Sequence, residues 1–228
     1  MASTEIKTKE IEKAVSVIIK KTFEKLVDIY SSHKEHHDKE IIRGEKSRLI
    51  FPCYGEHRDN EVRVSEQKLR FAFVESFYEY CSEENHLDLF YSIETPTQSK
   101  YSFIDKNKPH KCNENDDDYD SAKSASFDLV LYDNEMQRRA YIEFKANNAS
   151  KVEHLKDLCK LSKDPTNDNT LCYFIEIVKS HDDKTIESLK QKLSVENNMK
   201  KKIMCIVCDI NEEKEEENVI VGKEYIKR

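Results

Sequence analysis

The sequence predicts an α/β fold in which helices flank a mixed β-sheet. With only three glycines and four prolines among 228 residues, a loop-rich all-β fold is disfavoured. Apolar residues follow helical spacing in some segments and strand-like spacing in others. Three strand-like segments come in succession and later ones are separated by helical segments, which is typical of a mixed sheet with helices on its faces.

The first part of the chain is predicted to be helical. Residues 5–30 carry apolar side chains at helical spacing, and Ser3 or Thr4 is a candidate cap. The stripe consists of Ile11, Val15, Ile18, Ile19, Leu26 and Tyr30. A second helix is expected from Val64 to Cys81, with Ser65 as candidate cap. Its stripe consists of Leu69, Phe73, Phe77 and Tyr80.

The segment between these helices, residues 31–47, contains three histidines close together. They are His33, His36 and His37. Three histidines are candidate metal ligands, but the segment has no apolar framework and no cysteine, so a solvated loop is the favoured interpretation. Residues 48–55 form a short extended piece that Pro52 and Gly55 end.

The rest of the chain alternates between strands and helices. Predicted strands cover 87–97, 126–133, 139–146, 170–180 and 201–210, with an edge strand at 217–225. Predicted helices cover 151–163 and 184–195. The polar residues 105–123 are predicted to be a mobile acidic loop.

Composition narrows the function without deciding it. Nucleotide-binding glycine motifs do not occur in the sequence. The net charge of −7 does not indicate nucleic-acid binding. It does not exclude such binding either, because much of the acid lies in residues 113–120 and 211–218, and local patches of charge rather than the total determine what a surface binds. Cys205 and Cys208 are spaced as one CxxC in an apolar run, where buried thiols are favoured over a redox pair or half a zinc site. Since neither a signal peptide nor a long apolar run is evident, we expect a cytoplasmic protein without membrane contact.

The strands at 126–133 and 139–146 are close enough in sequence to form a hairpin. If it folds symmetrically about Glu135 and Met136, Asp128 lies opposite Glu143. Opposed residues share a face with Cβ atoms about 5 Å apart, and Lys145 follows on the same face. Paired carboxylates favour a hard divalent cation such as Mg²⁺, and an adjacent lysine can hold a water or stabilise charge on phosphorus.

The stretch "SFDLVLYD…AYIEFKAN" resembles the signature of the PD-(D/E)XK nuclease superfamily, the restriction-endonuclease-like proteins. Here the signature is Asp128, fourteen residues, then Glu143-Phe144-Lys145, with Phe127 where a proline is common. The resemblance implies a mixed β-sheet with an αβββαβ core over residues 64–180. It also implies a nuclease-like domain at 61–228, with an N-terminal helical extension at 1–60 packed on the core.

The resemblance also implies roles for particular residues. Asp128 and Glu143 would bind Mg²⁺ or Mn²⁺, with the Phe144 carbonyl as a further ligand, and Lys145 would orient the attacking water. A helix glutamate would support a second metal or the water network. We favour Glu66 in the first helical turn over Glu75. The implied products carry a 5′-phosphate and a 3′-hydroxyl.

The expected substrate is nucleic acid, with DNA favoured over RNA, and a homodimer is left open. Candidate substrate-binding residues are Gln98, Arg63, Lys100 and Asn147, beside the plainer interpretations of a turn residue, surface cations and a helix cap at Asn147 or Asn148. Tyr141 shares the face of Glu143 and either lines the cleft or only packs. The alternative function is a catalytically silent nuclease-fold module that binds nucleic acid or a partner protein.

Overall fold

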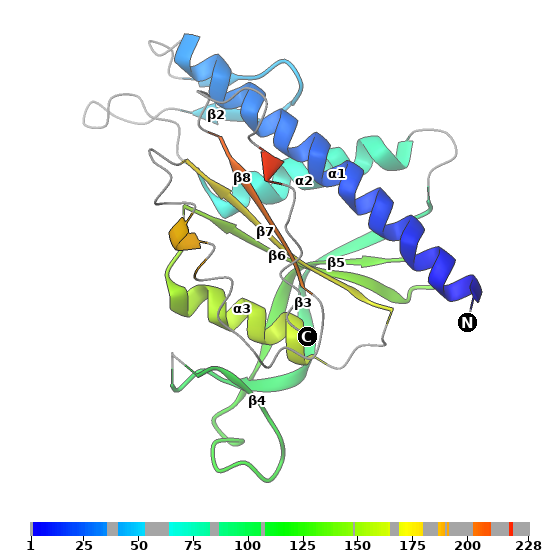
Figure 1. The fold of residues 1–228 in the computed structure, drawn as a ribbon, viewed down its shortest axis with the longest axis vertical. Helices are drawn as coiled ribbons and strands as arrows, with labels where there is room; N and C mark the ends of the chain where they lie inside the picture. The colour runs from blue at the N-terminus through cyan, green and yellow to red at the C-terminus, as the bar shows by residue number, and fades with distance from the viewer. Residues whose placement is uncertain are drawn as a thin grey trace.

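A computed structural model describes most of the chain as three helices and nine strands (Figure 1). It covers residues 2–35, 41–52, 64–82, 87–105, 108–147, 149–164, 169–179, 187–189, 191, 203–210 and 219–220. The helices are α1 (Ala2–Glu35), α2 (Glu66–Ser82) and α3 (Lys151–Lys163). The strands are β1 (Ile41–Arg43), β2 (Ile50–Pro52), β3 (Phe90–Ser102), β4 (His110–Cys112), β5 (Lys123–Tyr132), β6 (Arg138–Ala146), β7 (Leu171–Val178), β8 (Met204–Asp209) and β9 (Val219–Ile220). Within these ranges, no helix is long and apolar enough to cross a membrane.

Seven of the strands form one mixed sheet, so the predicted α/β class is confirmed. The order across the sheet is β4-β3-β5-β6-β7-β8-β9, and β1 pairs separately with β2. Strands β3, β5 and β6 are antiparallel neighbours, whereas β6, β7 and β8 run parallel. Helix α3 connects β6 to β7, as a parallel pair requires. From α2 to β7 the sheet therefore contains three antiparallel strands, a crossover helix and a parallel strand, with the short β4 inserted after β3.

Helices α1 and α2 cover one face of the sheet together. The predicted stripe of α1 is buried, and the stripe of α2 joins it in one apolar core with Leu129, Ile142 and Phe144 from the sheet. Phe73 of α2 contacts Phe144 edge to face, with ring centroids 5.4 Å apart. Both helices thus form because their apolar faces have the same sheet surface to bury.

Helix α3 lies against the opposite face of the sheet (Figure 1). Its Leu158 and Leu161 pack with Phe127, Tyr141 and Phe174. Tyr141 therefore belongs to the core, since it is 1% exposed and its ring stacks on that of Phe127 with centroids 4.2 Å apart. The start of α3 is set by Ser150, whose hydroxyl accepts the Glu153 N–H while the Glu153 carboxylate accepts the Ser150 N–H.

The predicted hairpin register is confirmed from Leu129 to Leu131, and it shifts by one residue beside the turn, where Tyr132 pairs with Arg138. Leu129 pairs with Ile142, Val130 with Tyr141 and Leu131 with Ala140. Continuing this register by one residue places Asp128 opposite Glu143. At this position β6 contacts a side chain of β5, because the Phe144 N–H donates to Asp128 Oδ2 at 2.7 Å.

Several predicted segments were wrong in extent. Helix α1 continues to Glu35, past His33, while His36 and His37 lie outside the described residues. Strand β3 continues to Ser102, because it pairs with β5 as far as Tyr101 and its last three residues pair with β4. The segment 105–123, predicted as a loop, contains strand β4 and a series of hydrogen-bonded turns. Of the predicted helix 184–195, residues 187–189 and 191 are described, and they are helical.

Candidate active site

Charged side chains from four elements meet at the end of the β5–β6 pairing. We call them the charged cluster: Glu66 and Arg70 of α2, Asp128 of β5, Glu143 and Lys145 of β6, and Asp157 and Lys160 of α3. Four carboxylates thus face three cations. The three signature residues and Glu66, which the sequence singled out, all belong to it.

Asp128 is held by two donors. Its Oδ1 accepts from Arg70 Nη2 at 2.6 Å, and its Oδ2 accepts the Phe144 N–H. Arg70 also donates from Nη1 to Glu94 Oε1 at 2.8 Å. The backbone of Phe144, whose carbonyl was expected as a metal ligand, therefore adjoins the Asp128 carboxylate.

Glu143 is the most deeply buried acid of the charged cluster, with 2% of its side chain exposed. Its Oε1 lies 2.7 Å from Lys160 Nζ. Burial and the nearby carboxylates of Asp157 and Asp128 raise the pKa of Glu143 well above its usual range, although Lys160 opposes that rise. Burial and the neighbouring acids therefore outweigh the contact with Lys160 in setting the direction of this pKa shift.

Lys145 does not pair with Glu143, its neighbour in the signature. Its Nζ lies 2.8 Å from Asp157 Oδ2 and 3.2 Å from Glu66 Oε1. Burial by itself would lower the pKa of Lys145, but Asp157 and Glu66 outweigh burial and raise it. Lys145 is thus a protonated donor, suited to holding a water or an anionic oxygen rather than to accepting a proton.

The residues that sequence reasoning missed come from the helices. Asp157 Oδ1 lies 2.9 Å from Lys160 Nζ, which also donates to the Ser126 carbonyl at 2.9 Å. A signal for this pair exists, since Asp157 and Lys160 stand three residues apart beside the apolar Leu158 and Leu161 of an amphipathic helix. Charged residues next to a buried stripe need partners in the interior.

A buried contact between a histidine and a glutamate supports the charged cluster from β7. Glu176, the register partner of Lys145, is fully buried and its Oε2 lies 2.7 Å from His154 Nε2. The other ring nitrogen of His154 lies 2.9 Å from the Ser150 carbonyl oxygen. These contacts tie the beginning of α3, and with it Asp157, to the sheet.

Other candidates lie away from the charged cluster. Glu75 accepts from Ser47 Oγ at 2.5 Å and from the Arg48 N–H at 2.8 Å, so Glu66 is the helix glutamate that contacts Lys145. The Gln98 N–H donates to Asp164 Oδ1 at 3.0 Å, near the end of α3.

Of four further candidates, two contact other parts of the chain and two lie outside the described residues. Lys100 Nζ lies 4.3 Å from the centroid of the Tyr119 ring. Asn147 does not cap α3, because Ser150 does; its side chain donates to the Val64 carbonyl at 2.8 Å. Arg63 and Asn148 lie outside the described residues.

The donors of the charged cluster fit a divalent metal in kind. Mg²⁺ and Mn²⁺ prefer carboxylate oxygens, which Asp128, Glu143 and Asp157 supply. The raised pKa of Glu143 is the electrostatic sign of a site that lacks positive charge. Arg70 and Lys160 contact the same carboxylates, so a metal bound there would take over contacts that these two cations now make.

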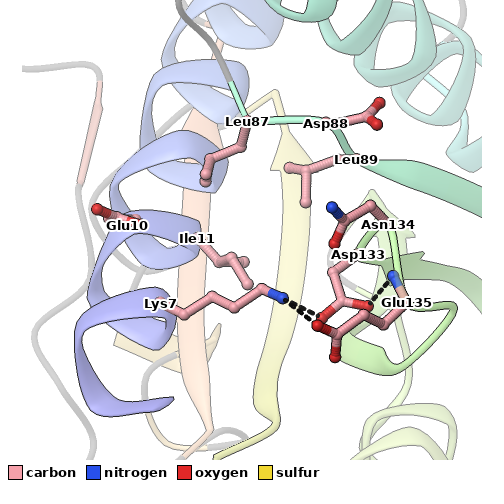
Figure 2. Close-up of a pocket in the computed structure, with 9 residues that line it drawn as sticks. All are labelled: Lys7, Glu10, Ile11, Leu87, Asp88, Leu89, Asp133, Asn134 and Glu135. Carbon is pink, nitrogen blue, oxygen red and sulfur yellow. Dashed lines mark hydrogen bonds and ion pairs between the residues drawn. The ribbon is translucent and has the colours of Figure 1, made fainter. Parts of the chain in front are cut away.

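A separate cavity opens at the turn end of the hairpin. It has a volume of about 480 Å³ and lies between α1, residues 87–89 and residues 133–135 (Figure 2). Ile11, Leu87 and Leu89 form its apolar side. On the other side Lys7 Nζ lies 2.8 Å from Asp133 Oδ2. This cavity shares no residue with the charged cluster.

Comparisons with known proteins assign the chain to no family. No family model matches the chain, and neither a curated protein nor a solved structure matches it. The class of protein that fold and site define is therefore a mixed α/β protein with a buried cluster of carboxylates and cations at the end of a hairpin. Its function is argued from that cluster alone.

Proposed function

We propose that the protein is a metal-dependent nuclease of the PD-(D/E)XK type. The observation that carries the proposal is the convergence of Asp128, Glu143 and Lys145, in a register that the hairpin defines, on one end of the sheet. The order of α2, three antiparallel strands, α3 and a parallel strand agrees with the αβββαβ core that the resemblance implies.

In this proposal Asp128 and Glu143 hold Mg²⁺ or Mn²⁺, with the Phe144 carbonyl beside them. The bound metal would activate a water and stabilise the charge that develops on the phosphodiester. Protonated Lys145 donates to that water or to a phosphate oxygen, since Asp157 and Glu66 keep its ammonium in place. Lys160 and Arg70 then become free to compensate charge on the substrate.

A second candidate function rests on the same ion pairs. Arg70, Lys145 and Lys160 already neutralise much of the carboxylate charge, which is what a catalytically silent module would need in order to stay folded without a metal. Such a module would bind nucleic acid or a partner protein without cutting it.

Cleavage assays separate the two candidates. Plasmid DNA, linear duplex, single-stranded DNA and RNA are incubated with the protein under titrated Mg²⁺ and Mn²⁺. A nuclease cleaves at least one form in the presence of metal, and Lys145→Ala lowers the rate by a factor of about 10² to 10³, the usual range for a lost donor to developing negative charge. Lys20→Ala, on an exposed part of α1, is the matched control and keeps full activity.

Two results would contradict the nuclease proposal. A folded protein that binds one of these nucleic acids with no metal-dependent cleavage is the silent module. A rate that Lys145→Ala and Glu143→Ala leave unchanged would show that any cleavage comes from a contaminant.

A further inference from the structure

The acidic segment after β4 is folded by its own hydrogen bonds. The Asp116 N–H donates to the Asn113 carbonyl at 3.0 Å, and the Tyr119 N–H donates to the Asp116 carbonyl at 3.0 Å. The Ser121 N–H donates to the Asp118 carbonyl at 3.1 Å. Successive turns therefore bring the carboxylates of this segment back toward β4.

Four side chains with metal-binding atoms converge there. His110 and Cys112 are two apart on β4 and so project from the same side of the strand. Ligand atoms of His110, Cys112 and Asp116 all lie within 4.8 Å of one another. Asp118 Oδ2 lies 3.3 Å from His110 Nε2, and Cys112 Sγ lies 3.6 Å from Asp118 Oδ1.

These spacings are short enough for the side chains to share one metal ion, and the Asp118 contacts, made through Oδ2 to His110 and Oδ1 to Cys112, are the tightest. With Zn–N and Zn–O bonds of about 2.1 Å and Zn–S bonds of about 2.3 Å, a tetrahedron separates nitrogen from oxygen by about 3.4 Å and sulfur from oxygen by about 3.6 Å. The contacts of Asp118 with His110 and Cys112 have these lengths.

Neighbouring groups orient the ligands as outer partners do in metal sites. His110 Nδ1 lies 3.4 Å from the Lys108 carbonyl oxygen, which can accept its proton in the tautomer whose Nε2 binds a metal. Asp116 Oδ2 accepts the Asn113 N–H at 2.7 Å and its side-chain amide at 3.3 Å. An adjoining surface hollow of about 420 Å³ is lined by His110 and residues 115–118.

We propose that His110, Cys112, Asp116 and Asp118 bind Zn²⁺. A set of one imidazole, one thiolate and two carboxylates suits a borderline-soft metal, unlike the oxygen-only donors of the charged cluster. The metal fastens the segment 108–121 to the β3–β4 edge of the sheet. The site is independent of the proposed nuclease function.

Cobalt substitution tests the site directly. The full-length protein is stripped with a chelator and titrated with Co²⁺, whose thiolate ligation gives a charge-transfer absorption and whose tetrahedral ligation gives strong visible bands. We expect one such Co²⁺ per chain, displaced by Zn²⁺. The bands are lost in Cys112→Ser and retained in Cys81→Ser and Cys205→Ser, which remove thiols far from β4 in the sequence. Metal bound only by the charged cluster would show no thiolate absorption.

A second set of variants covers the case in which Cys112→Ser fails to fold. Asp116→Asn changes a ligand in the turn, and Asn113→Ala removes an outer partner for which an affinity loss of about 10-fold to 100-fold is usual. Zn²⁺ affinity is measured by competition with a chromophoric chelator. Absence of the thiolate band in the unmodified protein, its persistence in a folded Cys112→Ser variant, or equal Zn²⁺ affinity in Asp116→Asn would overturn the proposal.

Discussion

The hairpin of β5 and β6 carries two buried carboxylates, Asp133 near its turn and Glu143 near its open end. Their pKa values are shifted in opposite directions. Near the turn, Asp133 Oδ1 accepts the N–H groups of Glu135 and Gln137, each at 3.0 Å. Its Oδ2 lies 2.7 Å from Arg139 Nη2 and 2.8 Å from Lys7 Nζ. Burial would raise the pKa of Asp133, but these donors together hold it well below its usual range.

Glu143 has fewer compensating groups. Its one described ion pair is with Lys160, which it shares with Asp157, and its pKa is raised by burial and by neighbouring acids. Both side chains are almost fully shielded from solvent, but Glu143 lies deeper in the protein, so deeper burial and fewer donors together account for its raised pKa. A carboxylate with a complete set of donors serves the structure, whereas one that lacks positive charge marks a place where a cation can be gained.

The largest expected effect is on stability. Asp133→Asn leaves Arg139 without its buried anion and should cost about 3 to 5 kcal/mol in the free energy of unfolding, measured by urea denaturation. Glu143→Gln should leave that free energy unchanged or raise it, because the amide removes the cost of burying an under-compensated charge and Lys160 keeps Asp157. Equal losses in both variants would contradict the comparison.

The two carboxylates should also have opposite pH dependences. The stabilisation from Asp133 is complete above the ordinary aspartate pKa of about 3.9 and is lost as the pH falls through its lowered folded value. The penalty from Glu143 is absent below about pH 4.3 and grows as the pH rises toward its raised folded value, by at most about 1.4 kcal/mol per pH unit.

This difference is measured by denaturing the wild type and both variants between about pH 4 and about pH 8. The gain of Glu143→Gln over the wild type should increase with pH, while the deficit of Asp133→Asn should stay nearly constant over this range, because the Asp133 stabilisation is lost only at lower pH. A gain from Glu143→Gln that does not change with pH would show that Glu143 titrates in its ordinary range.

A smaller effect is expected at the start of α3. Ser150→Ala removes the side-chain acceptor for the Glu153 N–H and should cost about 1 kcal/mol. Because α3 carries both Asp157 and Lys160, the proposed cleavage rate should fall as well. Ser150→Asp, which preserves a capping acceptor, serves as the control and should retain stability. An unchanged melting temperature in Ser150→Ala would show that the His154–Glu176 contact alone holds this end.

The smallest effect is expected for Lys7→Met. The Lys7 side chain is 31% exposed, and Asp133 keeps Arg139 and two backbone N–H donors without it. The free energy of unfolding should change by less than about 1 kcal/mol. A loss as large as that in Asp133→Asn would mean that Lys7 supplies a contact that Arg139 does not replace.

Local patterns predicted much of this structure. The apolar stripe of α1 and the boundaries of α3 follow from helical periodicity, and the symmetry of the hairpin predicted its register. Strand β4 was missed because three residues are too few to show a period. The length of β3 was missed because its pairing shifts register between Pro96 and Lys100.

The sequence by itself determined the order of the longer elements, the pairing of β5 with β6, and the placement of Asp128, Glu143 and Lys145 on that pair. These depend on neighbours along the chain, which periodicity and a short connection describe. Only the tertiary structure decided that Glu143 pairs with Lys160, that Lys145 pairs with Asp157 and Glu66, and that Arg70 reaches Asp128. Ion pairing depends on distance and burial across elements far apart in sequence, and only packing of α2 and α3 on opposite faces of the sheet sets those distances.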